Sequence, residues 1–358
     1  MEQCVIKAPL IPFWLLPSII ESIAEGSIFI VASIGLTLTL AVIKLPNFAQ
    51  AEFLTVGAYV GVVVSRFYPN NLLIIGVAAF LVCSAIAVAV HHVAYKPLMD
   101  RKVSIYFLVL ASFAVAQFIR YVVFAWAASV KPNLLDTQQQ IRIYTVVNFL
   151  QTPISNIYIV AILLAVATSI LLALFFNFTH LGKSMRAIAN NLDLARISGI
   201  NVSRSVNIMW IIAGGLGGIG GVILGTYTSV TPVLGYDTLL DIFAVVIIAG
   251  LTSFVGTIIG GLLVGFSTNT IIEALFYYFG VPLGYAPLLP FAMIVVILLV
   301  KPTGLAPNSQ TGIEFFRGLL RKNELTQGKS LDSSNSSSKS PTDSSPSSPI
   351  DGTLNGGN

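Results

Sequence analysis

Long apolar runs recur along most of the chain, and they restrict its fold more than any other feature. They lie near residues 26–45, 50–67, 72–95, 104–128, 155–176, 205–228, 238–251, 256–276 and 285–301. Most approach the roughly 20 residues that a helix needs to cross a bilayer, although the run at 238–251 is short. Hydrophobic residues make up 55% of the chain and charged residues only 9%, which excludes an ordinary soluble domain. The sequence therefore predicts an all-α polytopic membrane protein, a glycine-packed bundle with about 8–10 spanning helices.

Lysine and arginine residues fall in short clusters between the apolar runs, and the positive-inside rule places such clusters in the cytoplasm. The clusters are Lys44; Lys96, Arg101 and Lys102; Lys183, Arg186, Arg196 and Arg204; and Lys301, Arg317, Arg321 and Lys322. Nine crossings put them all on one side, with the N-terminus outside and the C-terminus in the cytoplasm. A tenth crossing, through the first helix, would bring both ends inside. We expect a multi-pass protein of the cell membrane, plasma or inner, with a cytoplasmic C-terminus.

Four parts are expected along the chain. Residues 1–25 should form a retained short or interfacial helix, because no net positive charge precedes their apolar stretch as a signal peptide requires. Residues 26–307 form the transmembrane domain, with a cytoplasmic loop at 178–204. Residues 308–325 are a basic juxtamembrane segment. Residues 326–358, which are rich in Ser and Pro, are predicted to be a disordered cytoplasmic tail.

Glycines are concentrated at 214–225, where the letters G-x-G-x-x-G occur inside an apolar run rather than after a strand. A dinucleotide site is therefore disfavoured. Glycines four residues apart instead let spanning helices approach closely. The glycines expected to pack helices in this way are Gly214, Gly217, Gly218, Gly221, Gly225, Gly256 and Gly260. So many close contacts indicate a compact bundle of the kind that lines a pathway.

Nothing in the sequence predicts catalysis, a cofactor or a metal site. The two GKS triplets, at 182–184 and 328–330, lack the first glycine of a phosphate-binding loop, because Asn177 and Asn323 stand in its place. The three histidines lie toward the ends of apolar runs and are not at metal-ligand spacing. We expect no enzyme activity, so any energy must come from another protein or from a gradient.

Charged side chains within the apolar runs are few, as expected when one at the bilayer centre costs roughly 2.5–3.5 kcal/mol. Those that come near are Glu52, Arg120, Asp241 and Glu273. Arg120 and Glu273 lie in or near the end half of a helix and could extend to the membrane surface, while Asp241 begins a segment. No relay of buried acidic or histidine side chains is evident, which disfavours gradient coupling.

Glu52 differs from the others because it follows a predicted helix break at Pro46 and Asn47. A break leaves backbone donors unpaired beside a carboxylate. One interpretation is a capped loop at the membrane face, and the other is part of a translocation path. On the second interpretation the candidate residues are Asn47, Phe48, Gln50, Glu52 and Gly57.

The stretch 181–200 is unusually charged for this chain. A helix starting at Ser184 would present an apolar stripe of Met185, Ile188, Ala189, Leu192 and Ala195. Its polar face would carry Lys183, Arg186, Asn190, Asp193 and Arg196, with Asp193 and Arg196 paired at i, i+3. Such a helix either lies on lipid headgroups or docks on a soluble partner, and the residues alone do not decide between these.

Four segments resemble the permease subunits of branched-chain amino acid ABC importers. Residues 181–204 are similar to the family's cytoplasmic loop, 35–61 to its first conserved segment, 93–101 to its Y-R-P-L turn, and 299–307 to the end of its last helix. The chain departs from the family at Gln50 and Ala51, where His and Gly are frequent, and its turn at 249–261 has fewer glycines. The resemblance covers roughly residues 26–307.

The resemblance implies that the cytoplasmic loop couples the membrane helices to an ATPase. The matching positions are Gly182, Met185, Arg186, Ala187, Ala195, Arg196, Gly199, Ile200 and Asn201. It further implies import of branched-chain or other hydrophobic amino acids by alternating access. The implied partners are a second homologous permease, two cytoplasmic ATPases that use the ATP, an extracytoplasmic binding protein and the bilayer, and no nucleic acid. The alternatives are an ABC permease for urea, short amides or another small solute, and a stand-alone channel or gradient-driven carrier.

Overall fold

The computed structural model describes residues 15–69, 71–130, 146–149, 152–301 and 304–305. The chain divides into two compact units, Met1–Gly312 and Ile313–Asn358, and every described residue belongs to the first. The expected basic segment and Ser-rich tail, at 308–325 and 326–358, therefore lie outside the described residues.

The described part is built almost entirely of helices. In chain order they are α1 (Leu15–Ile43), α2 (Gln50–Phe67), α3 (Leu72–Val90), the π-helical turn η1 (His91–Tyr95), α4 (Lys96–Asp100), α5 (Ile105–Val130), α7 (Asn156–Phe178), α8 (His180–Asn190), α9 (Leu192–Ile197), α10 (Val202–Tyr227), α11 (Leu234–Asp237), α12 (Leu239–Ala249), α13 (Phe254–Phe266), the π-helical turn η2 (Ser267–Ile271), α14 (Ile272–Phe279), the 3₁₀ turn η3 (Leu283–Tyr285) and α15 (Leu288–Val300). One antiparallel hairpin, of β1 (Val146–Phe149) and β2 (Thr152–Ser155), pairs Val146 with Ser155 and precedes α7.

Seven of the described helices or continuous helical stretches are long and apolar enough to span a membrane. They confirm the predicted class of an all-α polytopic membrane protein. Two of the expected spanning runs are not among the seven: 50–67, which forms α2, and 238–251, which forms the short α12.

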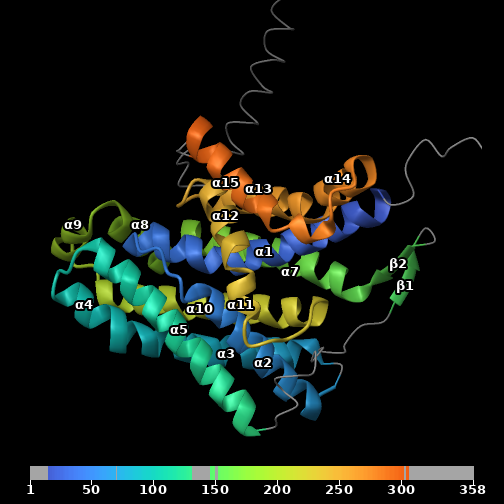
Figure 1. Cartoon of the computed structure of the whole chain (residues 1–358). Helices are drawn as coiled ribbons and strands as arrows, with labels where there is room; N and C mark the ends of the chain where they lie inside the picture. Colours follow the sequence, from blue (N-terminus) through green and yellow to red (C-terminus); the bar gives the residue numbers. More distant parts are fainter. Residues whose placement is uncertain (1–14, 70, 131–145, 150–151, 302–303, 306–358) are drawn as a thin grey trace, which may run out of the picture. The chain divides into compact units, whose positions relative to one another are not determined.

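Helices α1 and α10 form the centre of the bundle. In their most apolar windows 89% and 78% of the residues are buried, against 6% for the last candidate span, Leu283–Val300. Helix α10 packs against α2 and α3 on one side and against α1 on the other, and α1 continues the packing to α13, α12 and α7. Figure 1 shows these layers, with the short α11 standing between α2 and the yellow and orange helices of the C-terminal part.

The N-terminal boundary differs from the prediction. A helix break near residue 25 was expected, but α1 runs unbroken from Leu15 to Ile43. Two glutamates in this stretch have partners inside the bundle: Glu21 accepts a hydrogen bond from the Tyr158 hydroxyl, at 3.4 Å, and Glu25 accepts one from Thr268. Because other helices satisfy these carboxylates, the helix continues through them.

Candidate translocation site and coupling helices

The predicted break before Glu52 is confirmed, because α1 ends at Ile43 and α2 begins at Gln50. The Asn47 side chain organises the intervening turn. Its Oδ1 accepts hydrogen bonds from the Ala49 amide, at 3.1 Å, and from the Tyr95 hydroxyl, at 2.7 Å. The break is thus held to η1 by a buried side-chain hydrogen bond.

A buried ion pair lies in the first turn of α2. The Arg120 guanidinium, on α5, donates from Nε and Nη2 to Glu52 Oε1, and the two side chains are 11% and 1% exposed. Arg120 also donates to Gln117 Oε1, at 3.2 Å, and lies 4.4 Å from the centre of the Tyr236 ring. The expectation that Arg120 reaches the membrane surface is therefore wrong. Pairing inside the bundle removes the cost of burying either charge alone.

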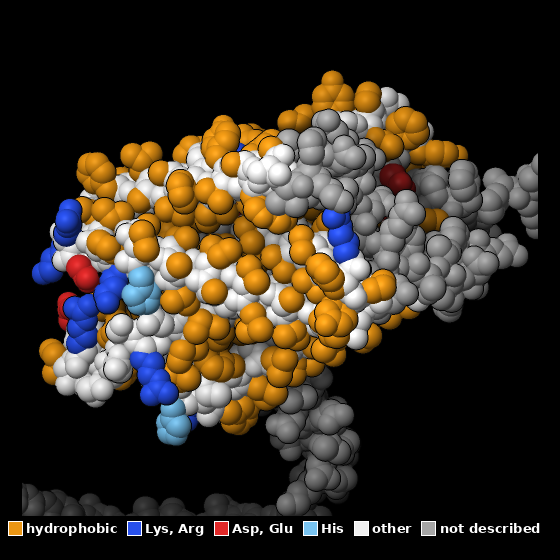
Figure 2. All heavy atoms as spheres, turned by 90° about the horizontal axis from the view of Figure 1, so that it is seen from below, with side chains coloured by type: hydrophobic (Ala, Val, Ile, Leu, Met, Phe, Trp, Pro, Cys, Tyr) orange, Lys and Arg blue, Asp and Glu red, His pale blue; other side chains and the backbone are white. Residues whose placement is uncertain are grey.

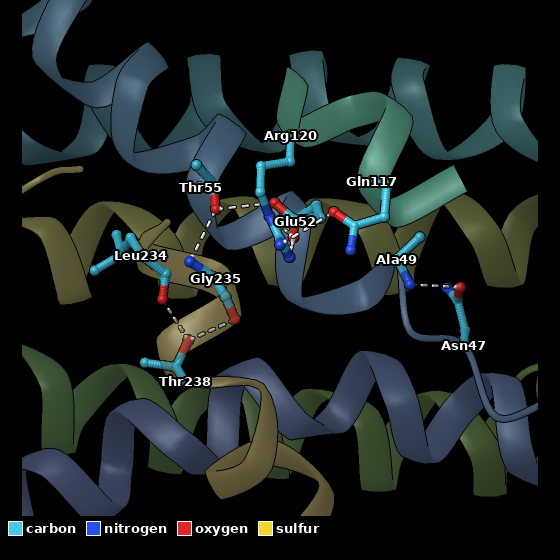
Figure 3. Close-up of polar contacts among 9 residues, drawn as sticks. All are labelled: Asn47, Ala49, Glu52, Thr55, Gln117, Arg120, Leu234, Gly235 and Thr238. Carbon is cyan, nitrogen blue, oxygen red and sulfur yellow. Dashed lines mark hydrogen bonds and ion pairs between the residues drawn. The ribbon is translucent and has the colours of Figure 1, made fainter. Parts of the chain in front are cut away.

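The same cluster fixes the short helix α11. Thr55 Oγ1 accepts a hydrogen bond from the Gly235 amide, at 2.9 Å, and donates to Glu52 Oε2, at 3.4 Å. A Cβ at Gly235 would lie 2.1 Å from the Ala51 carbonyl oxygen, so this approach requires glycine. Figure 3 shows how α2, α5 and α11 meet at these side chains. We call Glu52, Arg120, Gln117, Thr55 and Tyr236 the ion-pair cluster.

The five predicted path residues do not share one environment. Asn47, Gln50, Glu52 and Gly57 are buried, and Gln50 Nε2 donates to the Ala213 carbonyl of α10, at 3.0 Å. Phe48 is different because it stays partly exposed and stacks on Phe243 of α12, with centroids 4.7 Å apart. Of the five, Phe48 is the side chain that a passing solute could touch in this conformation.

Phe48 belongs to an aromatic group drawn from three elements. It also meets Phe113 of α5 edge-on, with centroids 6.2 Å apart, and Phe113 is 44% exposed. Sequence reasoning named neither Phe113 nor Phe243, since only the packing of α5 and α12 against the break brings them to Phe48. Phe48, Phe113 and Phe243 form the aromatic group of the site.

The predicted packing glycines lie in close contacts. A Cβ at Gly57 would come within 2.2 Å of the Gly218 carbonyl oxygen, and one at Gly221 within 2.0 Å of the Leu54 carbonyl oxygen. Gly217 faces Gln50 and Phe53, and Gly214 faces Ala87 and Cys83 of α3. On α13, Gly256 and Gly260 lie against the α12 backbone, and Gly225 is buried. Helices α2 and α10 are therefore in backbone contact.

Sequence reasoning missed a second polar group, formed where α1 meets η2 and α14. Glu25 accepts hydrogen bonds from Asn269 and Thr268, and Glu273 accepts one from Ser18. Glu21 lies one helical turn before Glu25 on α1 and accepts a hydrogen bond from the Tyr158 hydroxyl. We call Glu21, Glu25 and Glu273 the carboxylate cluster. Within the described residues, no group of three or more His, Cys, Asp or Glu side chains is arranged to hold a metal ion.

The loop predicted to be cytoplasmic forms two short helices instead of one. Helix α8 ends at Asn190 and α9 starts at Leu192, and the Asn191 side chain between them accepts from the amides of Asp193 and Leu194, both at 3.0 Å. The predicted single stripe is therefore wrong, because the chain turns at Asn191 and leaves Leu192 exposed. Asp193 and Arg196 are both described and exposed, and they do not form the predicted ion pair.

The two helices have different surroundings. Met185 and Ile188 of α8 are buried against the bundle, 0% and 3% exposed, and Gly182 packs on the Phe175 backbone. On α9 Ala195 is buried, but Leu194 and Ile197 are 61% and 84% exposed. Figure 2 shows Lys and Arg gathered at the end of the bundle where Figure 1 places α4, α8 and α9.

The six remaining loop positions join α9 to α10 or lie beside the buried stripe. Arg186 and Ala187 are partly exposed, and Arg196 is exposed. Gly199 takes a φ of +79°, which favours glycine. Ile200 packs against the core, and Asn201 Oδ1 caps α10 by accepting from the Arg204 amide, at 3.0 Å. Helix α9 is thus connected to α10 by a short, ordered turn.

Comparison with known proteins agrees with this architecture. The model of the family described as "Branched-chain amino acid transport system / permease component" matches residues 18–298. The probable branched-chain amino acid transport permease protein LivH of Methanocaldococcus jannaschii is 27% identical, over 82% of this chain and 91% of its own length. LivH of Escherichia coli K12 is 26% identical, over 82% and 95%. A galactose/methyl galactoside import permease, MglC of Haemophilus influenzae, is 33% identical but over only 33% of this chain and 35% of its own. The chain therefore belongs to the family of permease components of branched-chain amino acid transport systems.

Proposed function

We propose that the chain is the permease subunit of an ABC importer and forms part of the path for branched-chain or other hydrophobic amino acids. Its implied partners are a second homologous permease, two cytoplasmic ATPases that consume the ATP, and an extracytoplasmic binding protein. The chain itself contributes no ATPase site and no cofactor. Transport proceeds by alternating access, with the break at 44–49 and the short α11 and α12 lining the path.

The observation that carries this proposal is the exposed face of α9. An amphipathic helix lying on lipid would use its apolar stripe against the membrane. In this protein the apolar stripe of α8, Met185 and Ile188, is buried against the bundle and is not available to lipid. The apolar side chains that stay exposed are on α9, where Leu194 and Ile197 are more exposed than Leu192 and lie beside the cation of Arg196. Apolar anchors next to charge suit docking on a soluble protein.

The location of that face supports the rest of the proposal. Positive clusters mark the cytoplasmic side, and Figure 2 shows Lys and Arg gathered at the end that carries α8 and α9. A cytoplasmic ATPase would meet this end. The C-terminal end of α15 is followed by Lys301, which supports a cytoplasmic C-terminus by the same rule.

The substrate assignment draws on the relatives and on the aromatic group. Proteins that match over four fifths of the chain carry names of branched-chain amino acid permeases. Phe48, Phe113 and Phe243 offer an apolar surface at the break, which suits aliphatic side chains better than sugars or urea. The short match to a sugar permease keeps small polar solutes as the second candidate.

Two variants of the coupling helices, α8 and α9, test the proposal. One is a charge reversal on α8, and the other is an apolar-to-charged change on the exposed face of α9, which we call the docking face. In cells that also express the ATPases, Arg186→Glu and Ile197→Asp should reduce ATPase co-purification and leucine uptake more than tenfold, as loss of an interface hot spot does, while membrane insertion stays normal. Arg66→Glu, an exposed change outside the two coupling helices, is the matched control. Normal uptake by either coupling variant, or leucine transport by the purified chain alone in liposomes, would contradict the proposal. Competition by valine, urea and ribose distinguishes the substrate classes.

A further inference from the structure

Trp210 is fully buried on α10 and stacks on two rings of η1. Its ring centroid lies 5.1 Å from that of Tyr95, with an interplanar angle of 14°, and 5.6 Å from that of His91, with an angle of 24°. Tyr95 and His91 come from a π-helical turn between α3 and α4. Such turns are rare and are frequent at functional sites. This stack is not part of the aromatic group at the break, but a hydrogen bond joins the two.

That hydrogen bond runs from the Tyr95 hydroxyl to Asn47 Oδ1, at 2.7 Å. Asn47 directly precedes Phe48, whose ring stacks on Phe243. A continuous set of contacts therefore leads from α10 through Tyr95 and Asn47 to the partly exposed Phe48.

The cytoplasmic end of this set of contacts is the docking face. Helix α10 starts at Val202, directly after the turn that follows α9. Trp210 is eight residues further along, which is about 12 Å at 1.5 Å per residue. Asn201 caps α10 and Gly199 shapes the turn, so a displacement of α9 is passed to the first turns of α10.

The same region holds the buried unsatisfied polar side-chain atoms of the described structure. Six buried side-chain nitrogen or oxygen atoms there lack a hydrogen-bond partner. All six lie on the break, on η1 or on the helices α2 and α10 beside them. Apart from the Tyr59 hydroxyl, further along α2, they are Asn47 Nδ2, Gln50 Oε1, His91 Nδ1, Asn207 Oδ1 and Trp210 Nε1. Native interiors leave few such groups, and each calls for an explanation.

These atoms form a matched set. Asn47 Nδ2 and Trp210 Nε1 carry hydrogens to donate, while Gln50 Oε1 and Asn207 Oδ1 can accept. Asn207 and Trp210 lie on α10, whereas Asn47 and Gln50 belong to the break and the start of α2. A shift of α10 relative to α2 is the motion that would change which of them can pair. The present arrangement leaves donors and acceptors unpaired that a second arrangement of α10 and α2 could pair.

We propose that Trp210, Tyr95 and Asn47 form a relay that couples the docking face of α9 to the position of Phe48. The proposal rests on the proposed function, since it needs an ATPase to move α9. None of the three residues contacts substrate in this assignment. They are positioning residues, and removing the relay separates ATP hydrolysis from transport without preventing assembly.

The decisive variant is Tyr95→Phe, which removes the hydrogen bond to Asn47 and keeps the ring stack. In proteoliposomes holding the complete importer and its binding protein, the number of ATP molecules hydrolysed per leucine imported should rise roughly fivefold or more, the range of typical coupling free energies. ATPase co-purification should be unchanged. Tyr59→Phe is the matched control, because Tyr59 is 3% exposed and its hydroxyl has no partner, and it should keep the wild-type ratio.

A second measurement follows the break directly. A cysteine introduced as Phe113→Cys, in a chain whose Cys4 and Cys83 are replaced by alanine, reports on exposure beside Phe48. Labelling by a membrane-impermeant thiol reagent should differ between nucleotide-free and nucleotide-bound complexes, and Tyr95→Phe should abolish this difference. A wild-type ATP-to-leucine ratio in Tyr95→Phe, or a persisting difference in labelling, would overturn the relay. Failure of the unmodified complex to hydrolyse ATP or import leucine would instead overturn the proposed function.

Discussion

The ion-pair cluster and the carboxylate cluster bury acidic side chains in two different ways. At the first, Glu52 faces the guanidinium of Arg120 and is 1% exposed. At the second, Glu25 and Glu273 receive hydrogen bonds from Asn269, Thr268 and Ser18. These donors satisfy lone pairs but carry no charge. The charge of Glu52 is therefore neutralised within the ion-pair cluster, whereas the carboxylate cluster retains the electrostatic cost of burying acidic side chains without a cation.

The two clusters also differ in whether they could couple transport to an ion gradient. A carrier driven by an ion gradient usually needs acidic side chains that exchange their proton or counter-ion. Glu52 is unsuited to this, because Arg120 holds it in an ion pair. The carboxylate cluster has the residue types that such a mechanism requires, so it is the place where the rival interpretation, a stand-alone carrier, can be tested against an ATP-driven permease.

The largest effect is expected from Arg120→Gln, because it leaves the Glu52 carboxylate buried without its cation. Removing one partner of a buried pair costs about 3–5 kcal/mol of stability. The free energy of unfolding of the purified protein measures it. Adding Glu52→Gln should recover part of the loss, so the double variant should lose less than the sum of the single variants. Additive losses would mean that the pair does not act as a unit.

A smaller effect is expected from Thr55→Val, which keeps the shape of the side chain but removes the acceptor for the Gly235 amide. An unsatisfied buried N–H costs about 1–3 kcal/mol. Thr168→Val is the control, since the Thr168 hydroxyl donates only to carbonyls of its own helix, Leu164 and Ala165, and its loss should stay within about 0.5 kcal/mol. Equal losses in the two variants would show that Thr55 does not hold α11.

The smallest effect is expected from Glu25→Gln. The amide oxygen can still accept from Asn269 and Thr268, so the stability should change by less than about 1 kcal/mol. ATP-driven leucine uptake by the complete importer should persist, because the proposed mechanism makes no use of this carboxylate. Loss of uptake in Glu25→Gln would contradict this expectation. It would make the carboxylate cluster the functional centre and favour a gradient-driven carrier.

Much of the fold could be predicted because it follows from local pattern. The length of the apolar runs predicted an all-α polytopic membrane protein. Pro46 and Asn47 predicted the break between α1 and α2 that the structure contains. The partner of Glu52 could not be predicted, because Arg120 lies on another helix and comes into reach only when α2 and α5 pack together. The continuation of α1 through residue 25 could not be predicted for the same reason, since Tyr158 and Thr268, which donate to Glu21 and Glu25, are far along the chain.

The coupling helices α8 and α9 show a different limit of prediction from sequence. Helical periodicity placed Met185 and Ile188 correctly on one stripe, and both are buried. It failed at Leu192 because Asn191 interrupts the helix and caps the next one. Asparagine is a preferred N-cap, so Asn190 and Asn191 before Leu192 contained a usable signal for two helices.

The end of α12 has a consequence for how the protein is made. Helix α12 has 11 residues, too few to cross a bilayer unaided. Its Ile248 carbonyl accepts a hydrogen bond from the Leu305 amide, at 2.9 Å, and a Cβ at Gly304 would lie 2.2 Å from the Gly250 Cα. The segment that closes over this helix end is therefore synthesised only after α13, α14 and α15. During translation, the end of α12 lacks these contacts until the last helix has been inserted. The final docking of α12 is therefore expected to be a late step of biogenesis.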